Sequence, residues 1–311
     1  MKLNKIIALI IVLCLSSTGL IAINQNAGTS GFQFLNLHFS ARSSAMANAY
    51  TGLSNEVNGV FFNPAGLFQL KTKQVSSTYM NYFEGVQCGS IVYGFPYRDN
   101  INLAFFSQFL YASEDETDSE GIVQGTFTMS NVVLGANYSR YINQIFDMGI
   151  NVKFIREALA DNDAMAAAID IGVMHQTTNE DVKVGLSLKN FGAQLTSHTG
   201  SEYKEGLPRT LAVGLNYHPT ERFYALVDLL KPFDYDISIR TGLEYSINEF
   251  LSLRAGYNSN SGDWKAGGDW EATSGLSTGF GLNWKKYNID YAINSYGDLG
   301  LVNQITLKYT F

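Results

Sequence analysis

Apolar and polar residues alternate along most of the chain from Lys73 onward. A period of two places successive side chains on opposite faces of a β-strand. The clearest examples are residues 146–154 and 182–189, in which apolar residues alternate with Gly, Asn, Ser, Asp and Lys. The pattern predicts fourteen strands, over residues 74–84, 86–95, 101–111, 128–141, 144–156, 165–176, 182–191, 208–217, 222–230, 236–246, 250–258, 275–285, 287–296 and 301–311.

The polar face of these strands carries mainly small and neutral residues: Gly, Ser, Asn and Thr. A soluble β-sandwich buries one face and exposes charged side chains on the other. A membrane-spanning barrel turns its apolar face to lipid and its other face to a wet or filled lumen, with strands of about ten residues. The pattern therefore favours an antiparallel transmembrane β-barrel.

The last stretch, residues 301–311, reads LVNQITLKYTF and has two distinct faces. Phe311, Tyr309 and Leu307 share the apolar face, together with Ile305 and Leu301. An unpaired strand of this kind would leave an aggregation-prone edge, so we expect it to close the barrel on the first strand. Taken alone, this strand also fits a soluble sandwich.

The predicted connections alternate in length. One set is short, at residues 96–100, 142–143, 177–181, 218–221, 247–249 and 285–286. The other set includes longer segments, at residues 112–127, 157–164, 192–207 and 259–274. Short periplasmic turns that alternate with longer extracellular loops are typical of outer-membrane barrels, and this order predicts that both termini are periplasmic.

The first residues have the pattern of a secretory signal peptide. Lys2 and Lys5 precede an apolar run over residues 6–15, and small residues follow it. The run is too short to span a membrane as a helix. We predict a signal peptide over residues 1–22, with cleavage after Gly19 or after Ala22.

Residues 23–72 differ in pattern from the strands that follow. Residues 41–51 are rich in Ala and Ser and predict a short, slim helix. In the sequence Asn63-Pro64-Ala65-Gly66, Asn63 is placed to cap a second helix whose first residue is Pro64. The segment is either an arm on the surface or a plug inside the barrel. The full prediction is an all-β membrane protein: a plug segment over residues 23–72 and a 14-stranded transmembrane barrel over residues 73–311.

Composition excludes several classes of function. The net charge is −7 and Lys and Arg are scattered, which argues against a nucleic-acid partner. The four histidines, His38, His175, His198 and His218, fall in unrelated segments, and the chain has no HExxH or GxSxG motif. We therefore predict no catalytic, cofactor or metal site, although an outer-membrane hydrolase with Ser and His on separate strands stays an alternative.

Two predicted loops carry candidate binding residues. The run Glu114, Asp115, Glu116, Asp118 and Glu120 is either a solvated acidic loop or a site for a divalent cation that bridges lipopolysaccharide. Loop 259–274 contains Trp264 and Trp270 in two near-copies of Gly-Asp-Trp. These tryptophans fit a partner anchor or a position at the membrane interface.

The chain resembles the PorV/PorQ-type outer-membrane proteins, which are relatives of the FadL-type long-chain fatty acid transporters. The resemblance lies in residues 28–67, which read GTSGFQFLNLHFSARSSAMANAYTGLSNEVNGVFFNPAGL, and continues through residues 125–155, 182–192 and 229–257. Asn63, Pro64 and Ala65 match the plug motif of the superfamily. The resemblance implies a fourteen-stranded barrel with an N-terminal plug in the outer membrane of a Gram-negative bacterium, in contact with its lipid and lipopolysaccharide.

The resemblance leaves two functions open. PorV-type relatives imply a non-enzymatic part in type IX protein secretion or surface attachment, with secreted cargo proteins as partners; we take this as the leading hypothesis. FadL-type relatives imply a channel for long-chain fatty acids or other hydrophobic small molecules. An apolar stretch near the N-terminus fits a ligand pocket for such molecules and comprises Phe32, Phe34, Leu35, Leu37 and Phe39.

Overall fold

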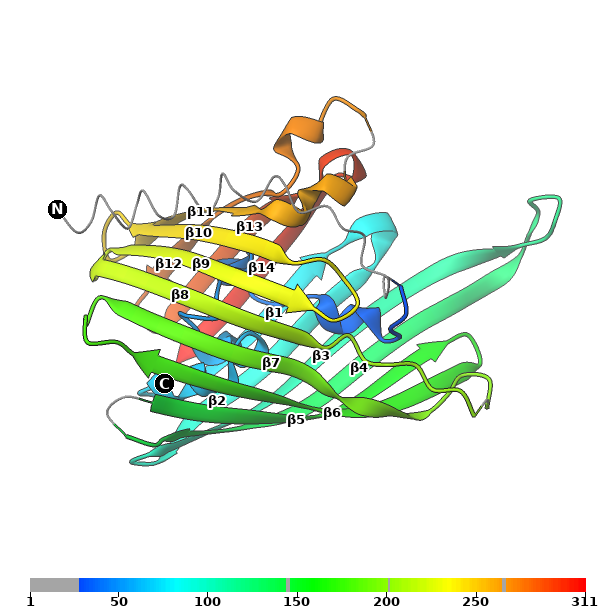
Figure 1. Ribbon diagram of the computed structural model, residues 1–311. Helices are drawn as coiled ribbons and strands as arrows, with labels where there is room; N and C mark the ends of the chain where they lie inside the picture. The colour runs from blue at the N-terminus through cyan, green and yellow to red at the C-terminus, as the bar shows by residue number, and fades with distance from the viewer. Residues whose placement is uncertain (1–27, 144–145, 201, 265–266) are drawn as a thin grey trace.

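The protein is a closed antiparallel β-barrel of fourteen strands (Figure 1). The structure, a computed structural model, describes residues 28–143, 146–200, 202–264 and 267–311, so the predicted signal peptide 1–22 lies outside the described residues. Each strand pairs with its neighbours in sequence, and the last pairs with the first. The strands are β1 Gln74–Asn81, β2 Gln87–Arg98, β3 Ile101–Thr117, β4 Val123–Tyr141, β5 Phe146–Leu159, β6 Asn162–Gln176, β7 Val182–Thr196, β8 Thr210–Thr220, β9 Phe223–Pro232, β10 Ser238–Ser246, β11 Leu251–Asn258, β12 Leu276–Trp284, β13 Tyr287–Ser295 and β14 Leu301–Thr310. The predicted fold class is confirmed.

The barrel closes where the sequence predicts. Strand β14 pairs with β1 from Gln74 opposite Thr310 to Asn81 opposite Asn303. Beyond the strand, the N–H of Phe311 donates to the carbonyl of Lys73 at 3.0 Å. Pairing of both end strands removes the open sheet edge that an incomplete barrel would expose.

The two faces of the wall are inverted relative to a soluble domain. On β14, Leu301, Ile305 and Leu307 are exposed on the outside, whereas Gln304 and Thr306 are buried on the inside. The other strands also turn large apolar side chains outward, whereas their inward side chains are a mixture of polar residues and apolar ones such as Phe106, Ile155 and Leu226. An apolar exterior around an interior that contains many polar groups is the arrangement of a transmembrane barrel.

The predicted loop 112–127 is wrong, because β3 and β4 continue through it. They form a hairpin that projects well beyond the barrel rim, and only residues 118–122 make the turn (Figure 1). The connection predicted at 157–164 likewise shrinks to residues 160–161 between β5 and β6. Main-chain pairing continues where both faces of the hairpin meet water. The strands are therefore longer than the alternating stretches on which the prediction was based. Long connections remain at 197–209 and 259–275.

The described part of the plug segment lies inside the barrel, in blue and cyan (Figure 1). Its short helices contact the inner wall: α2 Ala41–Ser44 contacts β12 to β14, and the 3-10 helix η4 Pro64–Gln69 contacts β3 to β6. Two further 3-10 turns are η2 Gln33–Asn36 and η3 Val57–Phe61. No helix among the described residues is long and apolar enough to cross a membrane.

The predicted helix over residues 41–51 is mostly absent. Only Ala41–Ser44 is α-helical, because Ala47 and Asn48 adopt positive φ angles of 53° and 60° that end the helix. The chain then folds into successive turns that follow the inner wall. The Ala and Ser residues of this segment are therefore explained by the close approach to the wall, and not by a long helix.

The plug segment runs through the barrel from one end to the other. The N–H of Gly31 donates to the carbonyl of Gly206 at 3.0 Å, at the end with the projecting hairpin. Residues 71–73 lead into β1 at the opposite end, where Phe311 also lies. The position of residues 1–27 is outside the described residues, so a common side for both termini stays a prediction.

Candidate functional site

Three pairs of glycines in the barrel wall form flat seats for the plug segment. In each pair the two glycines face each other on neighbouring strands: Gly149 and Gly172, Gly185 and Gly214, Gly242 and Gly256. A Cβ atom at Gly149 would lie 2.3 Å from the carbonyl carbon of Pro64, and one at Gly185 would lie 2.1 Å from the carbonyl oxygen of Thr51. Real Cβ atoms do not approach other atoms so closely, so any side chain at these positions would push the plug away.

The predicted motif Asn63-Pro64-Ala65-Gly66 lies on the first of these seats. The side chain of Asn63 accepts a hydrogen bond from the N–H of Ala65 at 3.1 Å, which is the N-cap geometry expected from the sequence. Its amide group also donates to the carbonyls of Thr51 and Val173, each at 3.1 Å. Asn63 therefore ties two turns of the plug to β6.

Inward-facing asparagines of β3, β4 and β5 bind the main chain of the plug. Asn102 donates to the carbonyl of Leu70 at 2.8 Å, and Asn151 donates to the carbonyl of Val60 at 2.8 Å. Asn137 donates to the carbonyl of Pro64 at 3.2 Å. These amides satisfy carbonyl groups that would otherwise be buried without a partner. The small neutral residues of the polar face thus serve to hold the plug.

A buried ion-pair network joins the plug to β10, β11 and β13. The guanidinium of Arg42 binds Glu244 through two nitrogens, at 2.8 and 2.7 Å. Glu244 also pairs with Arg254 at 2.5 Å, and Arg254 pairs with Asp290 at 2.7 Å. The bidentate geometry fixes the orientation of Arg42 against the barrel wall as well as its distance from it.

The same network extends to β14 and balances its own charge. Glu56 of the plug pairs with Lys308 and lies 3.6 Å from Arg42. With the four residues above, the network holds three cationic and three anionic side chains. Buried charges are tolerated when they are paired in this way.

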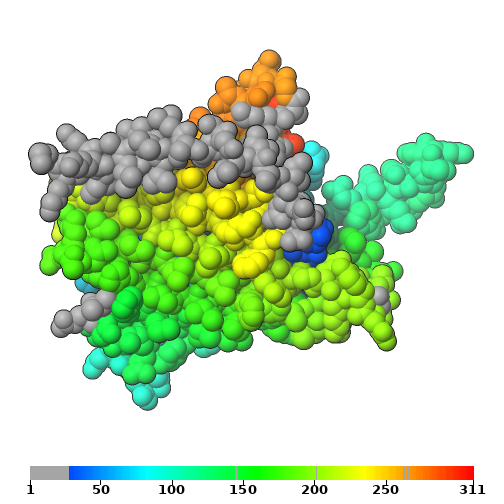
Figure 2. Space-filling model, viewed as in Figure 1, coloured from blue at the N-terminus to red at the C-terminus, as the bar shows by residue number. Residues whose placement is uncertain are grey.

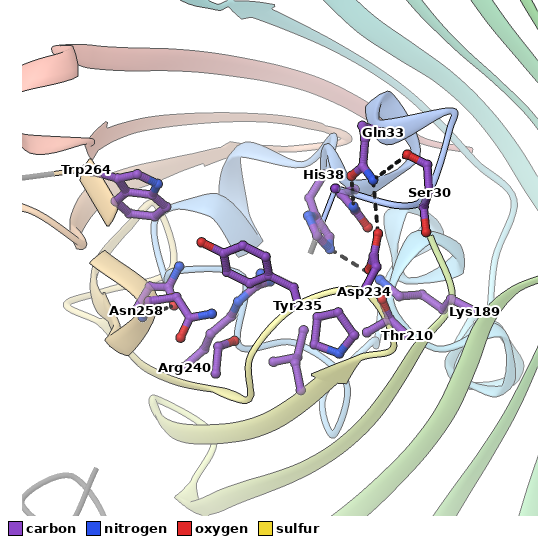
Figure 3. A pocket seen from close by; sticks show the side chains of 16 residues that line it. Ser30, Gln33, His38, Lys189, Thr210, Asp234, Tyr235, Arg240, Asn258 and Trp264 are labelled. Carbon is purple, nitrogen blue, oxygen red and sulfur yellow. Dashed lines mark hydrogen bonds between the residues drawn. The ribbon is translucent and has the colours of Figure 1, made fainter. Parts of the chain in front are cut away.

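A cavity of about 460 Å³ opens above the plug, at the end of the barrel with the projecting hairpin (Figure 3). His38, Lys189 and Arg240 face it, and His38 Nε2 lies 3.3 Å from Lys189 Nζ. Burial and the neighbouring cations Lys189 and Arg240 hold the pKa of His38 well below its usual value, so the ring is neutral. Leu230 and Trp264 contribute apolar surface to the lining.

Arg240 is a cavity residue with unsatisfied hydrogen-bond donors. Its Nε and Nη1 atoms are buried and have no hydrogen-bond partner among the described residues. The nearby carboxylate of Asp228 accepts from the N–H groups of Tyr50 and Thr51, at 2.9 and 2.8 Å, through one oxygen. A buried guanidinium with free donors favours an anionic group in the cavity.

A strap formed by residues 28–38 covers one side of the cavity. Gln33 donates to the carboxylate of Asp234 and to the carbonyl of Ser30, each at 3.0 Å (Figure 3). Phe32, Phe34, Leu35, Leu37 and Phe39, which were expected as pocket lining, are absent from the lining of this cavity. Phe32 and Phe39 are almost fully buried in the core, whereas Leu35 and Leu37 line a smaller hollow that shares His38 and Lys189 with the cavity. A ligand-binding role for this stretch stays a prediction.

The structure separates Trp264 from Trp270. Trp264 faces the cavity, with its ring centroid 4.4 Å from that of Tyr296. Trp270 is 62% exposed in the loop that stands above the rim, in orange (Figure 2). Of these two residues, Trp270 is the one exposed to a partner at the rim.

The acidic run lies on the projecting hairpin, where its residues are mainly exposed (Figure 2). Asp118 accepts hydrogen bonds from the N–H groups of Ile122 and Glu120 and from the Gln124 amide, and these bonds lower its pKa. No group of three or more His, Cys, Asp or Glu among the described residues is arranged to hold a metal ion. Cation bridging to lipopolysaccharide stays a prediction.

Of the residues that line the cavity, sequence reasoning singled out Trp264 and missed the charged ones. Lys189 and Arg240 are single charges on separate strands, and His38 was noted only as one of four histidines in unrelated segments. The available signal was a cation at an inward position of a strand, but the same signal also marks Arg254 of the ion-pair network. The other histidines lie apart, at the rim or near the turns, where His198 pairs with Glu157 at 3.3 Å.

Fold and interior together define a closed fourteen-stranded transmembrane barrel whose lumen is filled by the plug segment. No family model and no curated protein matches the sequence. Solved structures do match in fold. The toluene transporter TbuX of Ralstonia pickettii aligns with a TM-score of 0.62 at 13% identity, over 89% of this chain and 99% of TbuX. The monoaromatic hydrocarbon channel CymD gives 0.62 at 11% identity, over 86% and 96%. The toluene transporter TodX of Pseudomonas putida gives 0.52 at 14% identity, over 86% and 96%.

Proposed function

We propose that the protein is an outer-membrane channel that takes up hydrophobic small molecules carrying an anionic head group, such as long-chain fatty acids. The observation that carries this proposal is the cavity above the plug, whose lining includes Arg240 with no hydrogen-bond partner for Nε and Nη1 among the described residues. The solved structures of similar fold are named as transporters and channels for hydrocarbons, which supports the uptake reading over protein secretion.

The cavity has the size and chemistry of a ligand site. Its volume of about 460 Å³ falls within the range of roughly 300–1,000 Å³ that small-molecule pockets occupy. Leu230, Pro232 and Trp264 offer apolar surface to a hydrocarbon chain. Arg240 and Lys189 offer positive charge to a carboxylate.

Passage through the barrel requires a movement of the plug. Beneath the cavity, the plug segment lies in contact with the glycine seats, and its main chain is bound by the asparagines and by Asp228. A molecule bound in the cavity is therefore separated from the other end of the barrel by the plug segment. The end with the projecting hairpin faces the outside in this proposal, because longer extensions are extracellular in bacterial barrels.

The binding step is tested with two ligands of equal chain length, dodecanoate and dodecanol, on purified protein. We expect dodecanoate to bind more tightly, and Arg240→Gln to weaken only dodecanoate, by about 10- to 100-fold, the usual worth of a hydrogen bond to a charged group. The matched control is Arg156→Gln, whose side chain is 49% exposed and lies outside the cavity. Equal affinities for the two ligands, or no saturable binding, would refute the proposal.

A secretion or surface-attachment role of PorV/PorQ type is the second candidate. The exposed Trp270 favours it, since an exposed tryptophan is a common anchor for a protein partner. A deletion strain is measured for uptake of a labelled long-chain fatty acid and for its surface-attached proteins. We expect impaired uptake with an intact surface proteome. Lost surface proteins with normal uptake, restored by wild type but not by Trp270→Ala, would favour secretion; Trp264→Ala is the control inside the cavity.

A further inference from the structure

The outer face of the barrel carries a second hollow, far from the lumen cavity in structure and chemistry. It has a volume of about 500 Å³ and lies over β12, β13, β14 and β1. Its outward-facing lining consists of Val75, Ser77, Trp284, Tyr287, Ile289, Leu307 and Tyr309. Nothing in the proposed transport route uses this face.

The hollow forms because the outward side chains are small at its centre and large at one end. Ser77, a small residue on the outward face of β1, lies directly opposite Leu307 of β14. Toward the short turns, a row of rings stands up from the sheet. Ring centroids are 6.4 Å apart for Trp284 and Tyr287, and 5.0 Å apart for Tyr287 and Tyr309. The shape is an apolar floor that ends at an aromatic wall.

Two lysines lie next to this row of rings, at the end of the barrel. Lys285 and Lys286 form the exposed turn between β12 and β13. Lys285 Nζ lies 5.1 Å from the ring of Trp284, and Lys286 Nζ lies 5.9 Å from the ring of Tyr309. Rings and cations at this level occupy the boundary between hydrocarbon and lipid head groups, where a phosphate is within reach of the lysines.

We propose that this hollow is a binding site for an anionic phospholipid. One acyl chain lies along the floor between Ser77 and Leu307, and the phosphate is held by Lys285 and Lys286. The site goes beyond the proposed transport function, since it lies on the lipid-facing surface. Its charge identifies the head group: two cations favour an anionic lipid over a zwitterionic one.

A second copy of the chain fits this face less well. Two copies in one membrane share one orientation, so a two-fold contact through this face would bring both lysine pairs to the same level of the interface. A stable interface also needs about 800 Å² from each partner. The charge pattern therefore favours lipid as the occupant.

The test uses Trp284 as the reporter in a chain that carries Trp264→Phe and Trp270→Phe. This protein is placed in vesicles that contain brominated phosphatidylglycerol or brominated phosphatidylcholine, and quenching of Trp284 fluorescence gives the relative affinity. We expect stronger quenching by phosphatidylglycerol. Lys285→Ala and Lys286→Ala should each lower this preference by about fivefold.

Two further variants separate the site from ordinary membrane contact. Ser77→Phe fills the floor and should remove the preference for phosphatidylglycerol, while its unheated gel mobility shows that the barrel still forms. Arg98→Ala removes a cation 5.2 Å from the Tyr97 ring at the same end and should leave the preference unchanged. Equal quenching by both lipids in the parent chain would overturn the proposal, and so would a mass for two chains without bound phospholipid in native mass spectrometry.

Discussion

Replacing Arg42 by Ala removes one cation from the buried network that ties the plug to the barrel wall. The side chain of Arg42 is 12% exposed and that of its partner Glu244 is 4% exposed. After the change, the network holds two cations and three carboxylates. Glu244 then keeps only Arg254, which it shares with Asp290.

The magnitude follows from burial. Removal of one member of a buried ion pair typically costs about 3–5 kcal/mol, because an uncompensated charge stays in the interior. Since every 1.4 kcal/mol is tenfold in an equilibrium constant, the displaced state of the plug should gain about 10²- to 10⁴-fold in population. An exposed pair such as Arg156 and Asp163, 49% and 39% exposed, supplies the contrast. Its loss should cost only ~0.5 kcal/mol.

The assay is single-channel conductance in a planar bilayer, combined with urea unfolding of the protein from lipid vesicles. We expect frequent openings and a lower free energy of unfolding for Arg42→Ala, and wild-type behaviour for Arg156→Ala. The double variant Arg42→Ala with Glu244→Gln restores the charge balance and should recover part of the loss.

The reasoning is refuted if Arg42→Ala and Arg156→Ala give the same conductance and the same free energy of unfolding. It is also refuted if the double variant loses as much free energy of unfolding as the two single variants added together. The effects of two members of one network should not be additive.

Three further predictions concern assembly and closure. Gly172→Val should open the lumen, since a Cβ there would lie 2.0 Å from the Asn63 side chain, whereas Gly125→Val, 3.6 Å from its nearest neighbour in the hairpin, should not change conductance. Removing Phe311, or Phe311→Asp, should block membrane assembly because its exposed ring packs on Tyr309 at 4.9 Å on the outer face; normal amounts in the outer-membrane fraction would contradict this. The unheated protein should run faster on gels than the boiled protein, since a closed barrel resists detergent; recovery as a soluble periplasmic protein would contradict it.

The strands could be predicted because their signal is local. Alternation over residues 182–189 or 301–311 needs no knowledge of the neighbouring strand, and a barrel strand shows one face to lipid throughout. The hairpin at residues 112–127 was missed for the same reason. In its first arm, residues 112–117, both faces carry mainly polar residues, so the alternation disappears there while the main-chain pairing continues.

The interior could not be predicted because its signal is not local. Gly149 and Gly172 become a seat only when the register of β5 and β6 places them side by side. Arg42, Glu244 and Asp290 stand in separate segments and meet only in the closed barrel. Each of these residues, read alone, is an ordinary polar-face residue of its strand or turn.

The cavity and the plug lead to different transport defects, and the difference follows from where each charge lies. Arg240 faces the cavity, so its loss weakens capture of the anionic molecule and leaves the closed barrier beneath it unchanged. A higher concentration of the labelled fatty acid should then restore the uptake rate. Arg42 lies in the barrier itself, so its loss changes the rate at saturation, which no concentration can compensate. If uptake by the Arg240→Gln variant stays low at saturating fatty acid, Arg240 acts on the plug and the cavity is not the site of capture.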